Sequence, residues 1–93
     1  MDGCNGFSSL DGLKVAIYID NNEREYCFTQ KVFDLAEKGL LDKQGAECTA
    51  ESRTENATDI IFSAFNGKIF DGVPVTKQMI KEYTEQEFED RAL

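Results

Sequence analysis

In the first half of the chain, short apolar runs alternate with polar turn sequences. Residues 14–19 (KVAIYI) are rich in β-branched and aromatic side chains, which is typical of a strand. The DNNE sequence that follows favours a turn, and residues 24–29 (REYCFT) resume as a second strand. After Thr29, a suitable N-cap, apolar residues recur at helical spacing as far as Gly39. This pattern predicts a β-hairpin followed by a helix.

The second half contains two more apolar runs, which meet at Asn66-Gly67 within residues 59–72 (DIIFSAFNGKIFDG). An Asn-Gly pair readily supplies the two positive φ angles of a type I′ turn, so this stretch predicts a second hairpin. Its second strand should end near Asp71-Gly72, before Pro74 leaves the sheet. A helix over residues 59–66, with Gly67 as its C-cap, is the alternative.

The order of the predicted elements then repeats. VTKQMIKEY follows the second hairpin as FTQKVFDLA follows the first, and Thr76 stands in the N-cap position of Thr29. One hairpin with one helix buries little apolar surface, whereas two such units can share a sheet. The predicted fold class is therefore α+β: a mostly antiparallel sheet from two β-hairpins, each followed by a helix (tandem ββα). A short acidic C-terminal helix should begin at Thr84, where Thr84 and Glu87 match a capping box.

The 93 residues are expected to form a single domain. Residues 1–13 would be an N-terminal arm with two glycine turns, and residues 42–58 a polar connector between the two ββα units. The chain begins without a basic start or an apolar stretch, so we expect no signal peptide. No apolar run approaches the roughly 20 residues of a membrane helix, so the prediction is a cytoplasmic protein without a membrane partner.

The residue types argue against an enzyme. Histidine is absent, which removes Ser-His and Cys-His nucleophiles and imidazole metal ligands. Cys4, Cys27 and Cys48 are odd in number and widely spaced, so neither a disulfide framework nor a thiolate zinc site is expected, and Cys27 should be buried on a strand. No glycine-rich phosphate loop is present. We therefore predict no catalytic residues, no cofactor and no metal.

One segment nevertheless suggests a different chemistry. KVAIYIDNN resembles the opening strand of PIN-like nuclease domains of the NYN type. That resemblance implies that Asp20, directly after the strand, helps to hold a catalytic metal, and it makes a metal-dependent hydrolase a distant alternative. Those domains have parallel βαβ folds, whereas this chain is predicted to turn straight back into REYCFT, which favours a turn position for Asp20.

Charge is the main positive indication of function. Eighteen acidic residues against ten basic ones give a net charge of −8, which repels nucleic-acid phosphates and anionic membranes and favours a partner protein with a basic surface. The acids gather in the tail and around the first predicted turn. The candidate partner-binding residues are Glu82, Glu85, Glu87, Glu89, Asp90, Asp20, Glu23 and Glu25. A solvated surface that only keeps the protein in solution is the alternative interpretation.

The sequence thus favours a small acidic protein-binding module. In its more specific form, the protein is a stoichiometric inhibitor that presents carboxylates to the basic nucleic-acid-binding surface of a partner, in the style of phage anti-CRISPR or anti-restriction proteins. The alternative is a structural or regulatory interaction domain without nucleic-acid mimicry, which forms a homodimer through an exposed strand edge.

Overall fold

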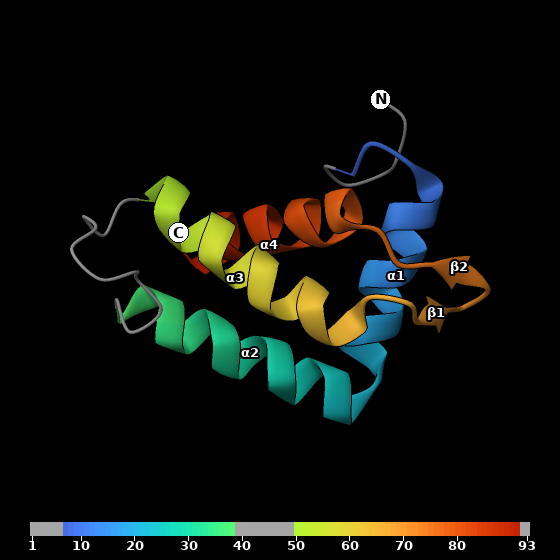
Figure 1. The fold of residues 1–93 in the computed structure, drawn as a ribbon, viewed down its shortest axis with the longest axis horizontal. Helices are drawn as coiled ribbons and strands as arrows, with labels where there is room; N and C mark the ends of the chain where they lie inside the picture. Colours follow the sequence, from blue (N-terminus) through green and yellow to red (C-terminus); the bar gives the residue numbers. More distant parts are fainter. Residues whose placement is uncertain (1–6, 39–49, 92–93) are drawn as a thin grey trace.

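The computed structural model describes residues 7–38 and 50–91, and helices dominate both ranges (Figure 1). The elements in chain order are α1 (Leu10–Asn21), α2 (Glu23–Glu37), α3 (Ala50–Phe65), β1 (Ile69–Phe70), β2 (Val73–Pro74) and α4 (Lys77–Arg91). The only sheet in the described residues is the two-stranded hairpin of β1 and β2. The predicted tandem ββα fold is therefore wrong, and the described chain is an all-helical arrangement with one small hairpin.

The first predicted hairpin is in fact two helices. Residues 14–19 lie within α1 and residues 24–29 within α2. The buried residues of α1 are Gly12, Val15, Ala16 and Ile19, which are spaced as one face of a helix. Because other apolar side chains stand between them, the run has no visible helical period and its β-branched content suggested a strand.

A one-residue junction separates α1 from α2. Ser9 caps the start of α1, where its side chain accepts a hydrogen bond from the Gly12 amide. Asn22 has an extended backbone between the helices, and its Nδ2 donates to the Tyr18 carbonyl at 2.7 Å. Asn22 therefore satisfies an open carbonyl of α1 while α2 begins at the next residue.

The helix predicted after Thr29 exists, but it begins earlier and Thr29 does not cap it. The buried residues of α2 are Thr29, Val32, Phe33 and Ala36, again at helical spacing. Gly39, predicted to end this helix, lies outside the described residues. The predicted connector, residues 42–58, is helix α3 from Ala50 onward, and its earlier part lies outside the described residues.

The Asn66-Gly67 pair ends a helix and does not turn a hairpin. Helix α3 continues to Phe65, and Gly67 follows it with a φ of 85°, the left-handed conformation of a helix C-terminus. The alternative interpretation of residues 59–66 as helix is therefore the correct one. The hairpin turn is Asp71-Gly72, whose φ angles of 55° and 78° are both positive as in a type I′ turn.

Helix α4 begins where the sequence indicated and extends further. Thr76 caps it, because the Met79 amide donates to Thr76 Oγ1 at 3.3 Å. The helix then continues without a break to Arg91, so the predicted separate acidic helix is wrong. Thr84, expected to cap that helix, is fully buried inside α4.

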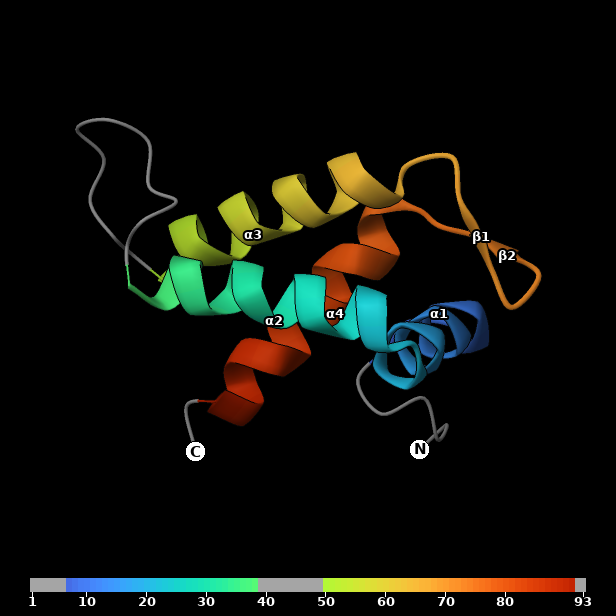
Figure 2. The same cartoon turned by 90° about the horizontal axis from the view of Figure 1, so that it is seen from below.

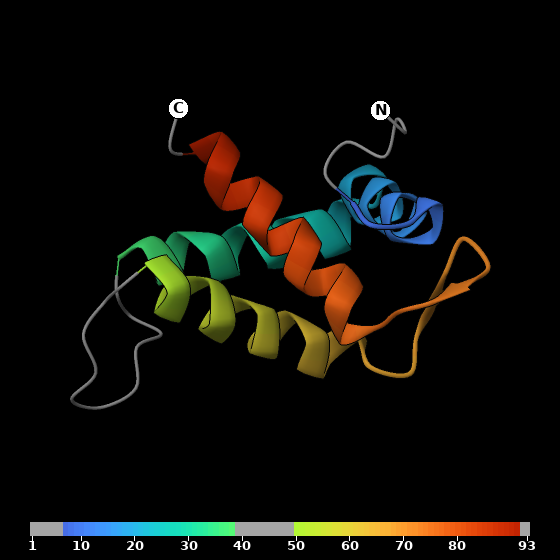
Figure 3. The same ribbon diagram turned by 90° about the horizontal axis from the view of Figure 1, so that it is seen from above.

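The helices pack around a single apolar core. Helices α2 and α3 lie side by side and antiparallel, and α4 crosses them (Figure 3). Helix α1 contacts α2 and also α4, and the small hairpin packs on α1 (Figure 2). There Phe70 stacks on Tyr18 with ring centroids 4.4 Å apart. Ile19, Phe33, Ile61 and Ile80, one from each helix, are completely buried. This arrangement places the end of α1 beside the acidic half of α4.

Candidate functional site

The predicted site residues lie on three helices. Five of them, residues 82–90, belong to the second half of α4; Asp20 is near the end of α1; and Glu23 and Glu25 are in the first turn of α2. The packing of α1 against α4 brings only some of these acids together.

A cleft of about 420 Å³ lies between α1 and α4. Its apolar part is formed by Phe7, Leu13, Ala16 and Ile17. Its acidic part is formed by Asp20, Glu87 and Asp90, with Tyr83 also in the lining. No described lysine or arginine lines it. We call this feature the α1–α4 cleft; it joins an apolar surface to three of the eight predicted site residues.

The hydroxyl of Tyr83 holds the two sides of this cleft together. It donates to Asp20 Oδ1 at 2.9 Å and lies 3.3 Å from Thr29 Oγ1, so one side chain of α4 connects α1 and α2. Thr29 is itself fixed, because its hydroxyl donates to the Tyr26 carbonyl at 3.0 Å. Tyr83 is only 5% exposed, and its partly buried bond to Asp20 restrains the Asp20 carboxylate at the edge of the cleft.

The electrostatics of the cleft favour a cation. Partial burial raises the pKa of Asp20; the hydrogen bond from Tyr83 opposes this, and the negative charge of Glu87 adds to it. Burial also raises the pKa of Tyr83 far above its usual value, so its hydroxyl remains a proton donor at neutral pH. A positive group placed in the cleft stabilises the ionised form of Asp20 and offsets its repulsion from Glu87.

Two of the predicted acids are engaged within the fold. Glu87 Oε2 accepts from Arg91 Nε at 2.8 Å, and Arg91 also bonds residues of α2. Glu82 accepts from the Ser8 amide at 3.0 Å and from Gln78 at 2.9 Å. Although partial burial opposes it, these hydrogen bonds lower the pKa of Glu82. Glu82 thus holds the segment that carries Phe7 against α4, at the edge of the cleft.

The other predicted acids lie elsewhere. Glu85 faces α3 and lines a different pocket, and Glu89 is exposed and lines neither. Glu23 and Glu25 stand at the positive end of the α2 dipole, which they stabilise. Glu82, Glu85 and Glu89 stand at positions i, i+3 and i+7 of α4, but they do not form one binding row, because these three side chains have different surroundings.

The described residues differ from the elements that the two alternatives were expected to use. KVAIYIDNN is helix α1 with its C-cap Asn22, so the strand implied by the resemblance to NYN-type nucleases is absent there. Among the described residues, no three acids or cysteines are grouped to hold a metal ion. Cys27 is exposed on α2, contrary to the prediction of a buried strand residue, while Cys4 and Cys48 lie outside the described residues. The strand edge that a homodimer was to use is two residues long in the described hairpin.

The apolar part of the cleft and the role of Arg91 were not found from the sequence. Leu10, Leu13 and Ile17 stand at positions i, i+3 and i+7 and form an apolar stripe on α1, in which Leu10 and Ile17 are exposed and Leu13 is half-buried. This apolar stripe can be recognised in the sequence once residues 10–21 are treated as a helix with two apolar faces, one of which is buried in the core while the other faces solvent.

Comparisons with known proteins add no assignment: no protein-family model, curated protein or solved structure matches this chain. Of the helices in the two described ranges, none combines the length and apolar character that crossing a bilayer requires. The properties of the cleft therefore provide the basis for a functional proposal.

Proposed function

We propose that this protein is a stoichiometric protein-binding module that holds a basic, amphipathic helix of its partner in the α1–α4 cleft. The observation that carries the proposal is the composition of the cleft, in which apolar side chains adjoin three carboxylates without a described basic residue. A helix with apolar residues along one face and lysines or arginines beside them complements both parts.

In its more specific form, the protein blocks the nucleic-acid-binding surface of that partner. Such surfaces present basic side chains to phosphates. The net charge of −8 supports an attraction to them, and the carboxylates of Asp20 and Asp90, together with Glu87, which also pairs with Arg91, supply the local contacts. The protein would then act as anti-CRISPR and anti-restriction inhibitors do, by occupying a site that nucleic acid otherwise fills.

Apolar contact and charge should contribute comparably to binding. Ile17 is 50% exposed, and covering the remainder of such a side chain is worth about 1 kcal/mol. Each exposed carboxylate paired with a lysine or arginine adds about 0.2–1 kcal/mol. Binding should therefore weaken as salt screens the charges but retain a salt-independent part from the apolar contact.

The charged part is tested with a labelled amphipathic peptide of leucine and lysine, followed by fluorescence anisotropy. The variant Asp20→Asn/Glu87→Gln/Asp90→Asn should bind about 3–150-fold more weakly and show a smaller salt dependence. The control Glu23→Gln/Glu25→Gln/Glu89→Gln removes the same number of charges outside the cleft and should bind nearly as the parent does. Equal losses in both variants would contradict a specific cleft and leave only overall charge.

The apolar part is tested separately. Ile17→Ser should weaken peptide binding about fivefold, because half of the side chain is open to the partner. Ile69, which is 65% exposed on β1, provides the control, and Ile69→Ser should leave affinity unchanged. If the two serine variants bind alike, the apolar side chains of α1 do not contact the peptide.

A further inference from the structure

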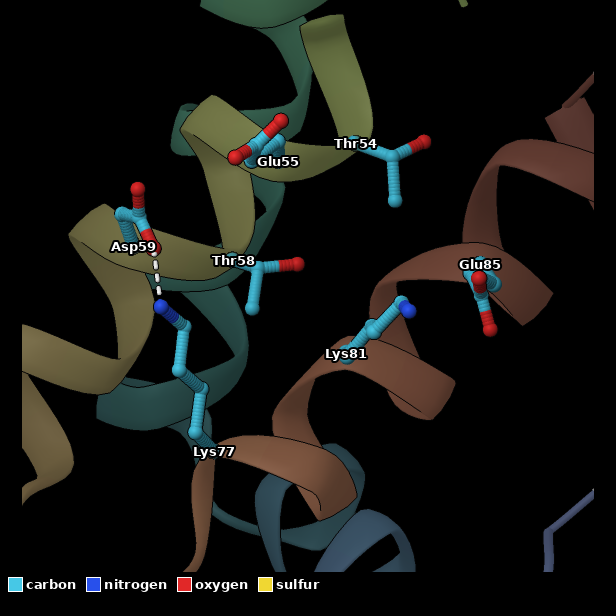
Figure 4. A pocket seen from close by; sticks show the side chains of 7 residues that line it. All are labelled: Thr54, Glu55, Thr58, Asp59, Lys77, Lys81 and Glu85. Atoms are coloured by element: carbon cyan, nitrogen blue, oxygen red, sulfur yellow. Dashed lines mark ion pairs between the residues drawn. The ribbon is translucent and has the colours of Figure 1, made fainter. Parts of the chain in front are cut away.

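A larger pocket, of about 590 Å³, lies between α3 and α4 and shares no lining residue with the α1–α4 cleft. Helix α3 contributes Thr54, Glu55, Thr58 and Asp59 (Figure 4). Helix α4 contributes Lys77, Lys81 and Glu85. We call it the α3–α4 pocket. The proposed protein-binding function does not use it.

The first unusual feature of this pocket is Thr58. Its side chain is 2% exposed, and its hydroxyl has no hydrogen-bond partner within the described part of the chain. Figure 4 shows this hydroxyl directed from α3 toward the space in front of Lys81. A buried hydroxyl without a partner destabilises a folded protein, whereas valine has nearly the same shape without this penalty. Thr58 is therefore a poor choice for packing alone and a suitable one for bonding a ligand.

The second feature is the set of charges left open in the pocket. Lys77 Nζ lies 2.9 Å from Asp59 Oδ1, so these two residues satisfy each other. Lys81, Glu85 and Glu55 are exposed and make no hydrogen bond or ion pair to any described residue. As far as the described residues show, the pocket thus offers one unpaired cation and two unpaired anions around the Thr58 hydroxyl.

We propose that the α3–α4 pocket binds a small zwitterion of the basic amino-acid class. Such a ligand carries one carboxylate and two cationic groups, which is the complement of the open charges of the pocket. Its carboxylate accepts from Lys81 and from the Thr58 hydroxyl, and its cationic groups meet Glu85 and Glu55. Thr58 then gains the hydrogen bond that it lacks in the unliganded protein.

The site is tested by titrating the ¹⁵N-labelled protein with L-lysine and following amide shifts. Binding should shift amides around Thr58 and Lys81 and leave those around Asp20 unchanged. Cadaverine, which is lysine without its carboxylate, should bind about tenfold more weakly, and Lys81→Met should reduce lysine to the affinity of cadaverine. The absence of shifts at tens of millimolar lysine, shifts confined to the α1–α4 cleft, or equal binding of lysine and cadaverine would overturn the proposal.

The contribution of the second cationic group is tested with Nα-acetyl-L-lysine, which keeps the carboxylate and the ε-ammonium group but lacks the α-ammonium group. Its affinity should be clearly lower than that of lysine, because one of the two cationic groups that meet Glu85 and Glu55 is missing. Affinity equal to that of lysine would contradict a ligand with two cationic groups.

The role of Thr58 is tested with a matched pair of variants. Thr84 on α4 is also fully buried with an unpartnered hydroxyl, but it does not line the pocket. Both Thr58→Val and Thr84→Val should raise the melting temperature of the free protein, and only Thr58→Val should weaken lysine binding. If Thr58→Val binds lysine as tightly as Thr84→Val does, the hydroxyl is not part of a ligand site.

Discussion

Arg91 should be the most important charged residue for the stability of this fold, and Arg91→Met tests this. The side chain lies at the end of α4 and is 20% exposed. Its guanidinium donates to Glu87 in its own helix and to three acceptors on α2: Asp34, Glu37 and Gln30, at 2.6–2.8 Å. It also lies 5.6 Å from the centre of the Phe33 ring. Arg91 thus fastens α4 to α2 by several contacts at once.

The magnitude follows from the exposure of each partner. Asp34 and Glu37 are 58% and 41% exposed, so solvent screens their ion pairs to about 0.5 kcal/mol each. The pair with Glu87, four residues earlier in α4, adds about 0.5 kcal/mol, and the hydrogen bond to Gln30 about 1 kcal/mol. Methionine keeps much of the apolar contact with Phe33. The free energy of unfolding should therefore fall by about 2.5 kcal/mol, which lowers the melting temperature by about 10–20 °C.

Urea denaturation of the parent and the variant measures this loss, and Lys77→Met is the control. Among the described residues, Lys77 forms a single ion pair, with Asp59. The two side chains are 62% and 45% exposed, so the loss of this pair should cost no more than about 0.5 kcal/mol. High salt should reduce the difference between Arg91→Met and the parent. If Arg91→Met is no less stable than Lys77→Met, the contacts of the guanidinium do not contribute as argued here.

Three further substitutions examine the cleft and the turns. Tyr83→Phe removes a hydroxyl that bonds Asp20 and Thr29, and thermal unfolding should show a loss of about 1 kcal/mol in stability. The control is Tyr18→Phe, which should change stability very little, because the Tyr18 hydroxyl bonds no described residue. The raised pKa of Asp20 means that the folded state binds its proton more tightly than the unfolded state does. The stability this provides is complete below the ordinary pKa of aspartate and is lost as pH rises through the raised value. Asp20→Asn should therefore leave a flatter pH profile between about pH 3 and 7, and an unchanged profile would refute this. Gly67→Ala should lower the free energy of unfolding by about 1 kcal/mol, because Gly67 has a positive φ. Gly12→Ala should raise it, because Gly12 lies inside α1 and no atom would be closer than 3.4 Å to the new methyl group. Equal effects of the two substitutions would contradict this reasoning.

Local signals were predictable where one residue decides the geometry. Thr76 caps α4 as predicted, because a cap needs no distant partner. At Gly67 only the alternative interpretation was correct: the preferred hairpin turn is wrong, and Gly67 follows the end of α3. The strand prediction for residues 14–19 failed because a short, β-branched apolar run suits a strand and a buried helix equally. Thr29 shows the limit of local patterns most clearly. Its sequence context predicts a helix cap, but Thr29 is buried within α2 and contacts Tyr83, and a local pattern cannot reveal a contact with a distant residue.

The candidate site was predictable only as a set of acids. Asp20 and Glu87 are far apart in sequence and meet because α1 packs against α4, which depends on the whole core. Their chemistry was correctly identified as acidic, but their grouping and the apolar side chains beside them required the tertiary structure. The same residue type does not by itself define the cleft, because the cleft does not include Glu23, Glu25 and Glu89.

The contacts of Tyr83 with Asp20 and Thr29 limit how far the α1–α4 cleft can open when a partner segment binds. Widening it would separate α1 from α4 and break the partly buried bond from Tyr83 to the Asp20 carboxylate, so the cleft is preorganised. A partner segment that enters it must adopt the shape already present, and the entropic cost of ordering falls on that segment.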